Sequence, residues 1–262
     1  MLKIVTSTTS IESAMKLRDA IEEVAHLPHK TILVSKSTAK SSGDTVIMRY
    51  GCQYGRLENE PLWGNSEFTK LCIDKIAFSN EFGMTLNVPI FYDDHLPTSW
   101  PVLVRNTLVG SKSEGITLCH SREDMVKVWK RGSYWTYFIQ HSSEIRVLAV
   151  FTEDAVPAFR IYKKVPRDST ESTNEFINGL NGEDNTKWIL KDIVYYPKVR
   201  QILEDINERV LALGGRFVAF DMIYSPDDGD WYVLEGNSGP WLSIPSAKWL
   251  AELFIADYGS LT

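Results

Sequence analysis

The sequence lacks the features that mark several common classes of protein. No apolar run reaches 18 residues and the first residues have no signal-peptide core, so we expect neither a membrane-spanning helix nor a secretory leader. A formal net charge of −6 argues against nucleic acid or an anionic membrane surface as the main partner. The histidines and cysteines form no His-Glu-x-x-His or Cys-x-x-Cys group, so a zinc site is not expected. No Walker loop and no Gly-x-Gly-x-x-Gly fingerprint is present.

Cysteine is scarce as well as scattered. Cys52, Cys72 and Cys119 are odd in number and lie in apolar settings, which favours reduced thiols in a protein core. We therefore expect a cytoplasmic protein. With 262 residues, of which 44% are hydrophobic and 24% are charged, the chain can bury a sizeable core and is near the upper limit for a single domain.

Strand and helix patterns alternate in the first third of the chain, which indicates a small open α/β domain with a parallel sheet. A polar stretch at 164–193 is interpreted as a functional loop or a partly disordered segment. The expected strands lie at 3–6, 31–34, 45–50, 88–91 and 134–140, and the expected hairpins at 101–118, 143–164 and 216–240. The expected helices lie at 10–24, 65–83, 121–130, 196–213 and 246–258.

The hairpin at 216–240 carries three polar side chains on strands that are otherwise apolar and aromatic. If residues 226–230 form the turn, Asp221 lies opposite Glu235, and Asn237 points to the same face as Glu235. Two facing carboxylates repel each other, and a hard divalent cation removes that repulsion. Asp, Glu and Asn oxygens suit Mg²⁺. The spacing alone leaves open the alternative of an exposed face with solvated acids.

The same residues resemble the signature of a known family. Phe220-Asp-Met-Ile, followed by Val233-Leu-Glu-Gly-Asn-Ser-Gly-Pro, is similar to the metal-binding strands of the ATP-grasp superfamily. The resemblance is to its branch of ribosomal-protein glutamate ligases and glutathione-synthetase-like enzymes, and it covers about residues 45–245. It implies that Asp221, Glu235 and Asn237 hold Mg²⁺ or Mn²⁺ against the phosphates of ATP.

This resemblance also implies contacts with ATP elsewhere in the chain. Lys75, in an Asp-Lys pair, would reach phosphate, although a lysine on an amphipathic helix is more often solvated. Arg105 and Asn106 stand where the family has Lys-Pro, and Arg105 keeps the positive charge. The resemblance further implies a loop over the phosphates, for which an ordinary hairpin turn is the alternative; its residues are Gly110, Ser111, Lys112, Ser113 and Gly115. It also implies an adenine hinge at Tyr137, Phe138 and Ile139, for which a buried aromatic strand is the alternative.

Arg146 and Arg160 lie in strands that are otherwise apolar. A strand arginine with apolar neighbours needs a buried anion or a route to water. The anion could be Asp221 or Glu235 in a structural ion pair, or it could be ATP phosphate and a carboxylate substrate. Glu144-Ile-Arg146-Val resembles the family's Glu-x-Arg-Val, and the resemblance implies catalytic roles for Arg146 and Arg160.

The resemblance implies an α/β (α+β) protein with the ATP-grasp fold, in which two lobes enclose ATP. The implied units are an N-terminal α/β domain at 1–95, a central lobe at 96–140 and a C-terminal lobe with the metal site at 141–262. The implied activity is that of an ATP-dependent, ADP-forming carboxylate–amine ligase that makes an amide bond through an acyl phosphate. Its partners would be a small molecule, peptide or protein with a carboxylate, and an amine acceptor.

Three alternatives remain at this point. The first is phosphoryl transfer to another acceptor, and the second is a nucleotide-binding regulatory module with weakened catalysis. The third is a structural α/β protein that binds no nucleotide. The sequence does not distinguish an amino acid from a peptide or a protein terminus as the acceptor, because the polar stretch at 164–193 lacks the Gly-Gly pair of the family's acceptor loop.

Overall fold

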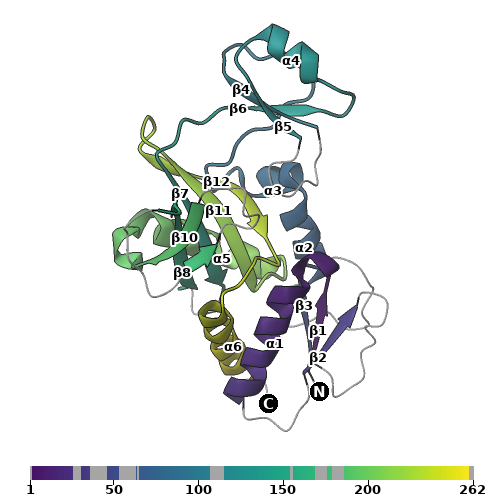
Figure 1. Cartoon of the computed structure of the whole chain (residues 1–262), viewed down its shortest axis with the longest axis vertical. Helices are drawn as coiled ribbons and strands as arrows, with labels where there is room; N and C mark the ends of the chain where they lie inside the picture. The colour runs from purple at the N-terminus through teal and green to yellow at the C-terminus, as the bar shows by residue number, and fades with distance from the viewer. Residues whose placement is uncertain are drawn as a thin grey trace.

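The computed structural model of the chain describes residues 2–25, 31–35, 46–52, 63, 65–106, 115–153, 156–168, 176–178 and 186–259. Three sheets and the helices packed on them form an elongated molecule of mixed α/β class, as predicted (Figure 1). Both chain termini lie at one end of the long axis. Among the described residues, none of the helices combines the length and the apolar character that crossing a membrane requires.

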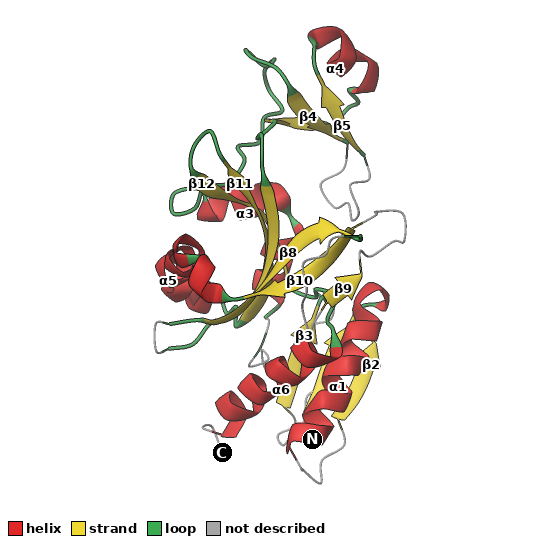
Figure 2. Cartoon of the chain, turned by 60° about the vertical axis from the view of Figure 1, so that its left-hand side comes forward, coloured by secondary structure: helices red, strands yellow, loops and turns green. Residues whose placement is uncertain are grey.

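The N-terminal sheet is parallel, as the alternating pattern predicts. Its elements are β1 (Leu2–Thr6), η1 (Thr8–Ser10), α1 (Ile11–Ala25), β2 (Thr31–Ser35) and β3 (Val46–Tyr50). β1 lies between β2 and β3. In α1, Ala14, Leu17 and Ile21 are buried at helical spacing. They belong to a core shared with the last helix, α6 (Ile244–Gly259), which lies beside α1 (Figures 1 and 2).

The second sheet is antiparallel and has six strands in the order β12-β11-β7-β8-β10-β9. The strands are β7 (Ser143–Val150), β8 (Ala158–Pro166), β9 (Phe176–Asn178), β10 (Thr186–Lys191), β11 (Phe217–Ser225) and β12 (Asp230–Asn237). One face packs on α2 (Ser66–Ile73), α3 (Lys75–Phe82) and α5 (Pro197–Ala212), which follows η2 (Ile193–Tyr195). The other face packs on α6 and is called the α6 face below.

A small lobe forms the end of the molecule opposite the termini (Figure 1). It contains β4 (Val102–Arg105), β5 (Ile116–Cys119), α4 (Arg122–Val128) and β6 (Tyr134–Tyr137). The strands form an antiparallel sheet in the order β5-β4-β6, and Val104, Met125 and Trp135 are buried in its core. The predicted strand at 134–140 therefore ends three residues early.

The helix predicted at 65–83 is interrupted at Asp74, which has an extended conformation with φ −91° and ψ 104°. The Asp74 carboxylate accepts hydrogen bonds from the backbone amides of Ile76 and Ala77, both at 3.0 Å. Aspartate is favoured at this capping position because it satisfies amides that lack a partner within the helix. The single-helix prediction was wrong, and the interruption makes Lys75 the first residue of α3.

Two further predictions need correction. Residues 88–91 form no strand, although the carbonyl of Asn87 accepts a hydrogen bond from the amide of Val233 in β12. The polar stretch at 164–193 is not simply a loop, because it contains β9 and β10, which extend the large sheet. Trp188 and Ile189 of β10 are both buried and, as neighbours in a strand, point to opposite faces, so β10 is covered on both faces here, which composition alone does not reveal.

Candidate functional site

The β11–β12 hairpin brings Asp221 directly opposite Glu235, as the spacing predicts. Two differences from the prediction cancel. The turn is one residue shorter, because Ser225 pairs with Asp230, and a bulge next to Asp221 restores the register. The bulge also reverses the alternation of side chains between the two faces of β12. Trp231 and Val233 pack toward the helices α2, α3 and α5, whereas Glu235 and the predicted ligand Asn237 lie on the α6 face.

Arg146 of β7 pairs with Asp221 from the neighbouring strand. Its Nε and Nη2 atoms donate to Oδ1 and Oδ2 of Asp221 at 2.7 and 2.8 Å, which makes a two-point ion pair. The two side chains are only 11% and 14% exposed. Burial would lower the pKa of Arg146, but Asp221, Glu235 and Glu144 together raise it above the usual arginine value. The guanidinium therefore stays charged, and the ion pair that the sequence left open is present.

Lys75 forms an ion pair with Glu235. A cation at the first position of a helix is disfavoured because it faces the positive end of the helix dipole. The carboxylate of Glu235 offsets this penalty, and the Lys75 side chain is 13% exposed. Four side chains from four elements thus form a row in the order Lys75, Glu235, Asp221 and Arg146, with two carboxylates between two cations, and we refer to them as the charge row.

Arg105 approaches the charge row from β4 of the small lobe. Its cross-strand partner is Tyr134 of β6. Burial lowers the pKa of Arg105, whereas Tyr134 and Glu235 act in the opposite direction. Burial likewise raises the pKa of Tyr134, on which Arg105, Asp74 and Glu235 also act. The Nε atom of Arg105 is buried and has no hydrogen-bond partner among the residues that the structure describes, so this arginine is suited to an anion that enters beside Glu235.

The segment after β12 is fixed by close contact with the N-terminal sheet. The amide of Gly51 donates to the carbonyl of Ser238 at 3.1 Å, and a Cβ atom at Gly239 would lie 2.4 Å from the Cα atom of Gly51. Only glycine permits such an approach of two backbones. Asn237 accepts a hydrogen bond from the amide of Gly239 through its Oδ1 atom at 3.0 Å. This contact orients the amide of the third predicted metal ligand.

Comparisons with solved structures agree with the architecture described above. No protein-family model and no curated protein matches the sequence. Among solved structures, D-alanine–D-alanine ligase from Bacillus anthracis is 16% identical with a TM-score of 0.62, over 97% of this chain and 93% of that chain. The ATP-grasp ligase PsnB, complexed with a minimal precursor, is 9% identical with a TM-score of 0.62, over 97% and 98%. N5-carboxyaminoimidazole ribonucleotide synthetase from Thermotoga maritima is 12% identical with a TM-score of 0.59, over 90% and 68%.

The chain has the ATP-grasp fold. At these identities the likeness concerns the fold, and it confirms at that level the resemblance found in the sequence. The fold brings Lys75, Arg105, Arg146, Asp221 and Glu235 near one another although they come from five different elements.

Other residues implied by the resemblance lie further from the charge row or outside the described part of the chain. Arg160 is on the α6 face, but its Nη1 atom donates to the carbonyl of Pro245 at 3.3 Å and its guanidinium lies 5.1 Å from the ring centroid of Trp249. It is directed at α6 and not at Asp221. Gly110, Ser111, Lys112 and Ser113 lie outside the described residues.

The last residue of the loop predicted to cover the phosphates and the expected adenine hinge both lie in the part of the chain that the structure describes. Gly115, with φ 71°, directly precedes β5, and its carbonyl accepts a hydrogen bond from Asn106 at 3.0 Å. Tyr137 hydrogen-bonds Thr98 through its hydroxyl at 2.9 Å. The amide of Phe138 donates to the carbonyl of Pro101, so this amide is not available to a ligand, and the carbonyl oxygen of Ile139 lies 3.2 Å from Nδ1 of His141.

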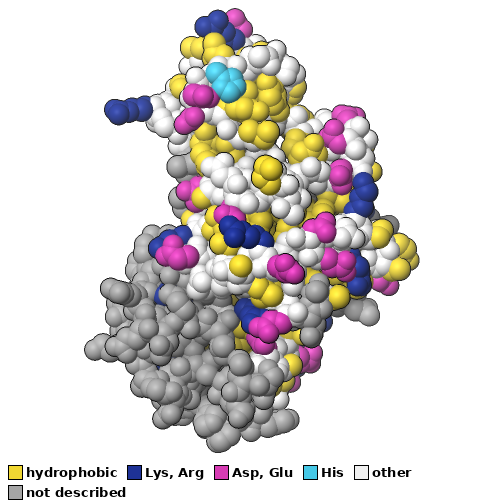
Figure 3. Space-filling view, turned by 180° about the vertical axis from the view of Figure 1, so that it is seen from behind, with side chains coloured by type: hydrophobic (Ala, Val, Ile, Leu, Met, Phe, Trp, Pro, Cys, Tyr) yellow, Lys and Arg dark blue, Asp and Glu magenta, His cyan; other side chains and the backbone are white. Residues whose placement is uncertain are grey.

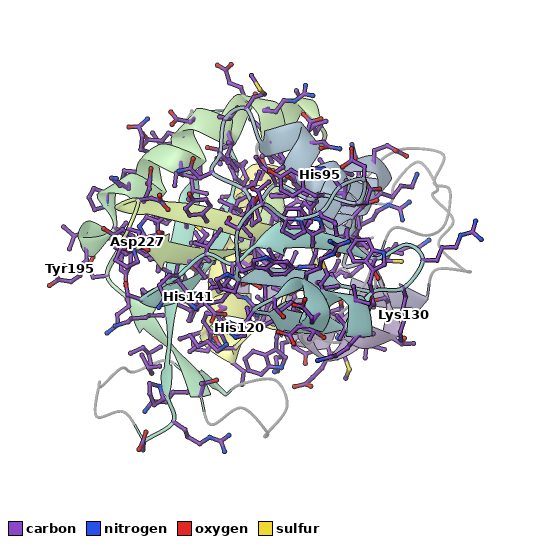
Figure 4. All side chains as sticks on the ribbon, turned by 90° about the horizontal axis from the view of Figure 1, so that it is seen from above. His95, His120, Lys130, His141, Tyr195 and Asp227 are labelled. Atoms are coloured by element: carbon purple, nitrogen blue, oxygen red, sulfur yellow. The ribbon has the colours of Figure 1, made fainter. Side chains whose placement is uncertain are left out.

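The donors present fit a hard divalent cation. Two carboxylates and an amide oxygen on one sheet face are the ligand types that Mg²⁺ takes, with water and phosphate as the remaining ligands. In the described part of the chain no group of three or more His, Cys, Asp or Glu side chains could hold a metal, and the candidate set combines two carboxylates with one amide. Asp227, in the turn of the same hairpin, is exposed and lies at the edge of the molecule in the view of Figure 4, away from this set.

Sequence reasoning missed two side chains of the α6 face. Lys164 of β8 pairs with Glu144, whose position was noted only as part of a motif, and Trp188 of β10 lies under the Lys164 ammonium. The β8–β10 pairing aligns Trp188 with Lys164. Period-2 alternation along β8 is the signal that could have placed Lys164 on this face, two residues from Tyr162.

Proposed function

We propose that the chain is an ATP-dependent carboxylate–amine ligase that joins a carboxylate to an amine and releases ADP. The observation that carries this proposal is the charge row, in which two facing carboxylates lie between Lys75 and Arg146, with Arg105 nearby. Three solved structures that share the fold are named as ligases or synthetases, which supports this reaction class.

Asp221, Glu235 and Asn237 would hold Mg²⁺ or Mn²⁺, and the bound ion would neutralise phosphate oxygens of ATP. Lys75 and Arg105 would bind the same phosphates, and the orphaned Nε atom of Arg105 supports this role. The loop at 107–115 would cover the phosphates, and residues 137–139 would border the adenine. We propose units at 1–95, 96–140 and 141–262, with ATP between the second and the third.

The reaction would proceed in two steps. First, an oxygen of the substrate carboxylate bonds to the γ-phosphorus of ATP while the bond from this phosphorus to the bridging oxygen breaks, which gives an acyl phosphate and ADP. Then the amine nitrogen bonds to the acyl carbon, loses a proton and displaces phosphate. Arg146 would stabilise the negative charge on the transferred group, because its fork to Asp221 holds the guanidinium in place.

Lys75 would exchange partners when the nucleotide binds. Without ligands it neutralises Glu235, and a metal ion on Glu235 would take over that task. The released ammonium group would then face the phosphates from the N-terminus of α3. This exchange supplies a cation at the phosphates without leaving a carboxylate unpaired at any stage.

A second candidate is a nucleotide-binding module with weakened catalysis. Two observations favour it: Arg105 replaces the lysine of the family, and both carboxylates already have cationic partners. Phosphoryl transfer to another acceptor uses the same groups and differs only in the product.

Thermal unfolding with ATP, with Mg²⁺ and with both tests the nucleotide site, and ADP release with carboxylate and amine mixtures tests ligation. We expect a shift that requires both components, since a ligand at about 100 times its Kd adds about 2.7 kcal/mol of stability. The double variant D221N/E235Q should lose this shift, whereas D227N, in the exposed turn of the same hairpin, should keep it. A shift that survives in D221N/E235Q contradicts the metal assignment. A shift without ADP release from any mixture favours the regulatory module.

A further inference from the structure

Gly236 lies on β12 between the two residues that would bind the metal from this strand, but it faces the other side of the sheet. On that side it meets α2 and α3. A Cβ atom at this position would lie 3.0 Å from Cε2 of Phe78, 3.2 Å from Sγ of Cys72 and 3.3 Å from Cγ2 of Val218. Carbon atoms prefer separations of about 3.5–4.0 Å, so the glycine leaves no room for a side chain.

Packing, and not the backbone conformation, explains this glycine. Gly236 pairs with Phe220 in the β11–β12 ladder and does not have a left-handed φ, so other residues could adopt its conformation. Its neighbours have little freedom to move. Phe78 is 1% exposed, and its ring centroid lies 4.9 Å from that of Phe82 and 6.2 Å from that of Phe220. A methyl group on Gly236 would therefore displace the backbone of β12 or of the helices.

The two helix residues that touch Gly236 lie on either side of the break between α2 and α3. Cys72 is in the last turn of α2, and Phe78 is in the first turn of α3. Lys75 begins α3 and pairs with Glu235, the neighbour of Gly236 in β12. Since β12 is the edge strand of its sheet, a side chain from the helices can reach Glu235 round this edge. The close approach and the ion pair thus hold the same point of the helix pair.

The start of α2 is held by other contacts. The Nδ2 atom of Asn65 donates to the carbonyl of Leu213 at 3.0 Å, and a Cβ atom at Gly215 would lie 2.7 Å from Cζ of Phe68. Both contacts connect α2 to the segment that follows α5. Because this end is fixed, a displacement at Gly236 would turn the helix pair about it. The start of α3 would move away from β12, together with the lysine at that position.

We propose that Gly236 is a positioning residue: its missing side chain sets the distance between β12 and the start of α3, and this distance places the ammonium group of Lys75 over the phosphates of ATP. The inference rests on the proposed function and adds to it a residue that touches neither the metal nor the nucleotide. A substitution at Gly236 should then change nucleotide affinity through Lys75 and through no other group.

The test is a double-mutant cycle of Gly236 and Lys75. Calorimetry measures the binding of a non-hydrolysable ATP analogue in the presence of Mg²⁺. G236A should weaken binding threefold or more, but by no more than K75M does. K75M/G236A should bind as K75M does, within twofold, because the lysine that would be displaced is already absent. Two residues that act independently would instead give the product of the two single losses.

Two further variants separate positioning from a general loss of packing. In C72A/G236A the sulfur atom is gone and the added methyl group has space, so binding should return to within twofold of the parent chain. V210A removes two methyl groups from α5 in the same core. It should lower the thermal stability without weakening binding.

The outcomes separate this inference from the proposed function. Unchanged binding in G236A, a loss in K75M/G236A equal to the product of the single losses, no recovery in C72A/G236A, or equal weakening in V210A overturns the inference and leaves the proposed function standing. Binding of K75M that equals that of the parent chain also overturns the inference alone, because Lys75 then does not contact the phosphates. Failure of the parent chain to bind the analogue with Mg²⁺ overturns both.

Discussion

Replacing Arg146 by methionine removes the guanidinium that neutralises Asp221 but keeps a long apolar side chain. Because the two partners are only 11% and 14% exposed, the variant leaves a nearly buried carboxylate without its partner. Breaking a buried ion pair from one side costs about 3–5 kcal/mol. In a chain of this size 1 kcal/mol corresponds to about 2–4 °C, so the midpoint of thermal unfolding should fall by about 6–20 °C without metal.

Mg²⁺ together with a non-hydrolysable ATP analogue should restore part of this loss. In R146M the metal neutralises a carboxylate that has lost its cation, so its stabilising effect should be larger than in the parent chain. R160M is the matched control, because Arg160 lies on the same face but is directed at α6. Its stability loss should not depend on metal. A drop of less than about 1 kcal/mol in R146M, the range of exposed ion pairs, refutes the reasoning, as does equal rescue of R146M and R160M.

Three further predictions concern single residues. K75M should change the free energy of unfolding by less than about 1 kcal/mol, because the lost pair with Glu235 is offset by the removal of a cation from a helix N-terminus. The same variant should weaken ATP binding tenfold or more. K70M, on the exposed side of α2, should leave both the stability and ATP binding unchanged. D74A should destabilise the chain by about 1 kcal/mol in urea unfolding and D74N by much less, since asparagine also caps a helix; equal losses contradict the capping role. Burial raises the pKa of Cys72, so the folded chain keeps a proton that the unfolded chain releases above about pH 8.5. The free energy of unfolding should therefore fall by about 1.4 kcal/mol per pH unit above that pH. C72A should flatten this decline, and an unchanged slope would show that another group causes it.

The sequence predicted the helices and strands correctly where residues close together in the chain determine them. Parallel pairing in the first sheet followed from alternation of strand and helix, and α5 from periodic apolar residues. The break between α2 and α3 carries a local signal too, since Asp74 is a preferred capping residue. It was missed because the apolar period continues across it. The position of Lys75 at a helix start depends on this break.

The features that the sequence did not predict depend on pairing between strands. The facing of Asp221 and Glu235 was predicted with a turn that is one residue too long, and it holds because a bulge compensates. An inserted residue changes neither composition nor the period on either side of it, so single-sequence reasoning has no signal for it. Lys164 and Trp188 were passed over for a similar reason. Their stretch is polar on average, and only pairing with β8 puts the indole ring over the α6 face.

The charge row explains why metal and nucleotide should bind together. Lys75, Glu235, Asp221 and Arg146 sum to zero, so a divalent cation alone would make the site strongly positive, with Arg105 adding to the excess. ATP alone would bring a polyanion next to two carboxylates. Each ligand removes the repulsion that the other meets, and the resulting coupling free energy acts equally on both affinities. On the face shown in Figure 3, the basic and acidic side chains of the described residues are interspersed. The coupling would arise at the charge row itself, where both ligands meet the same four charges.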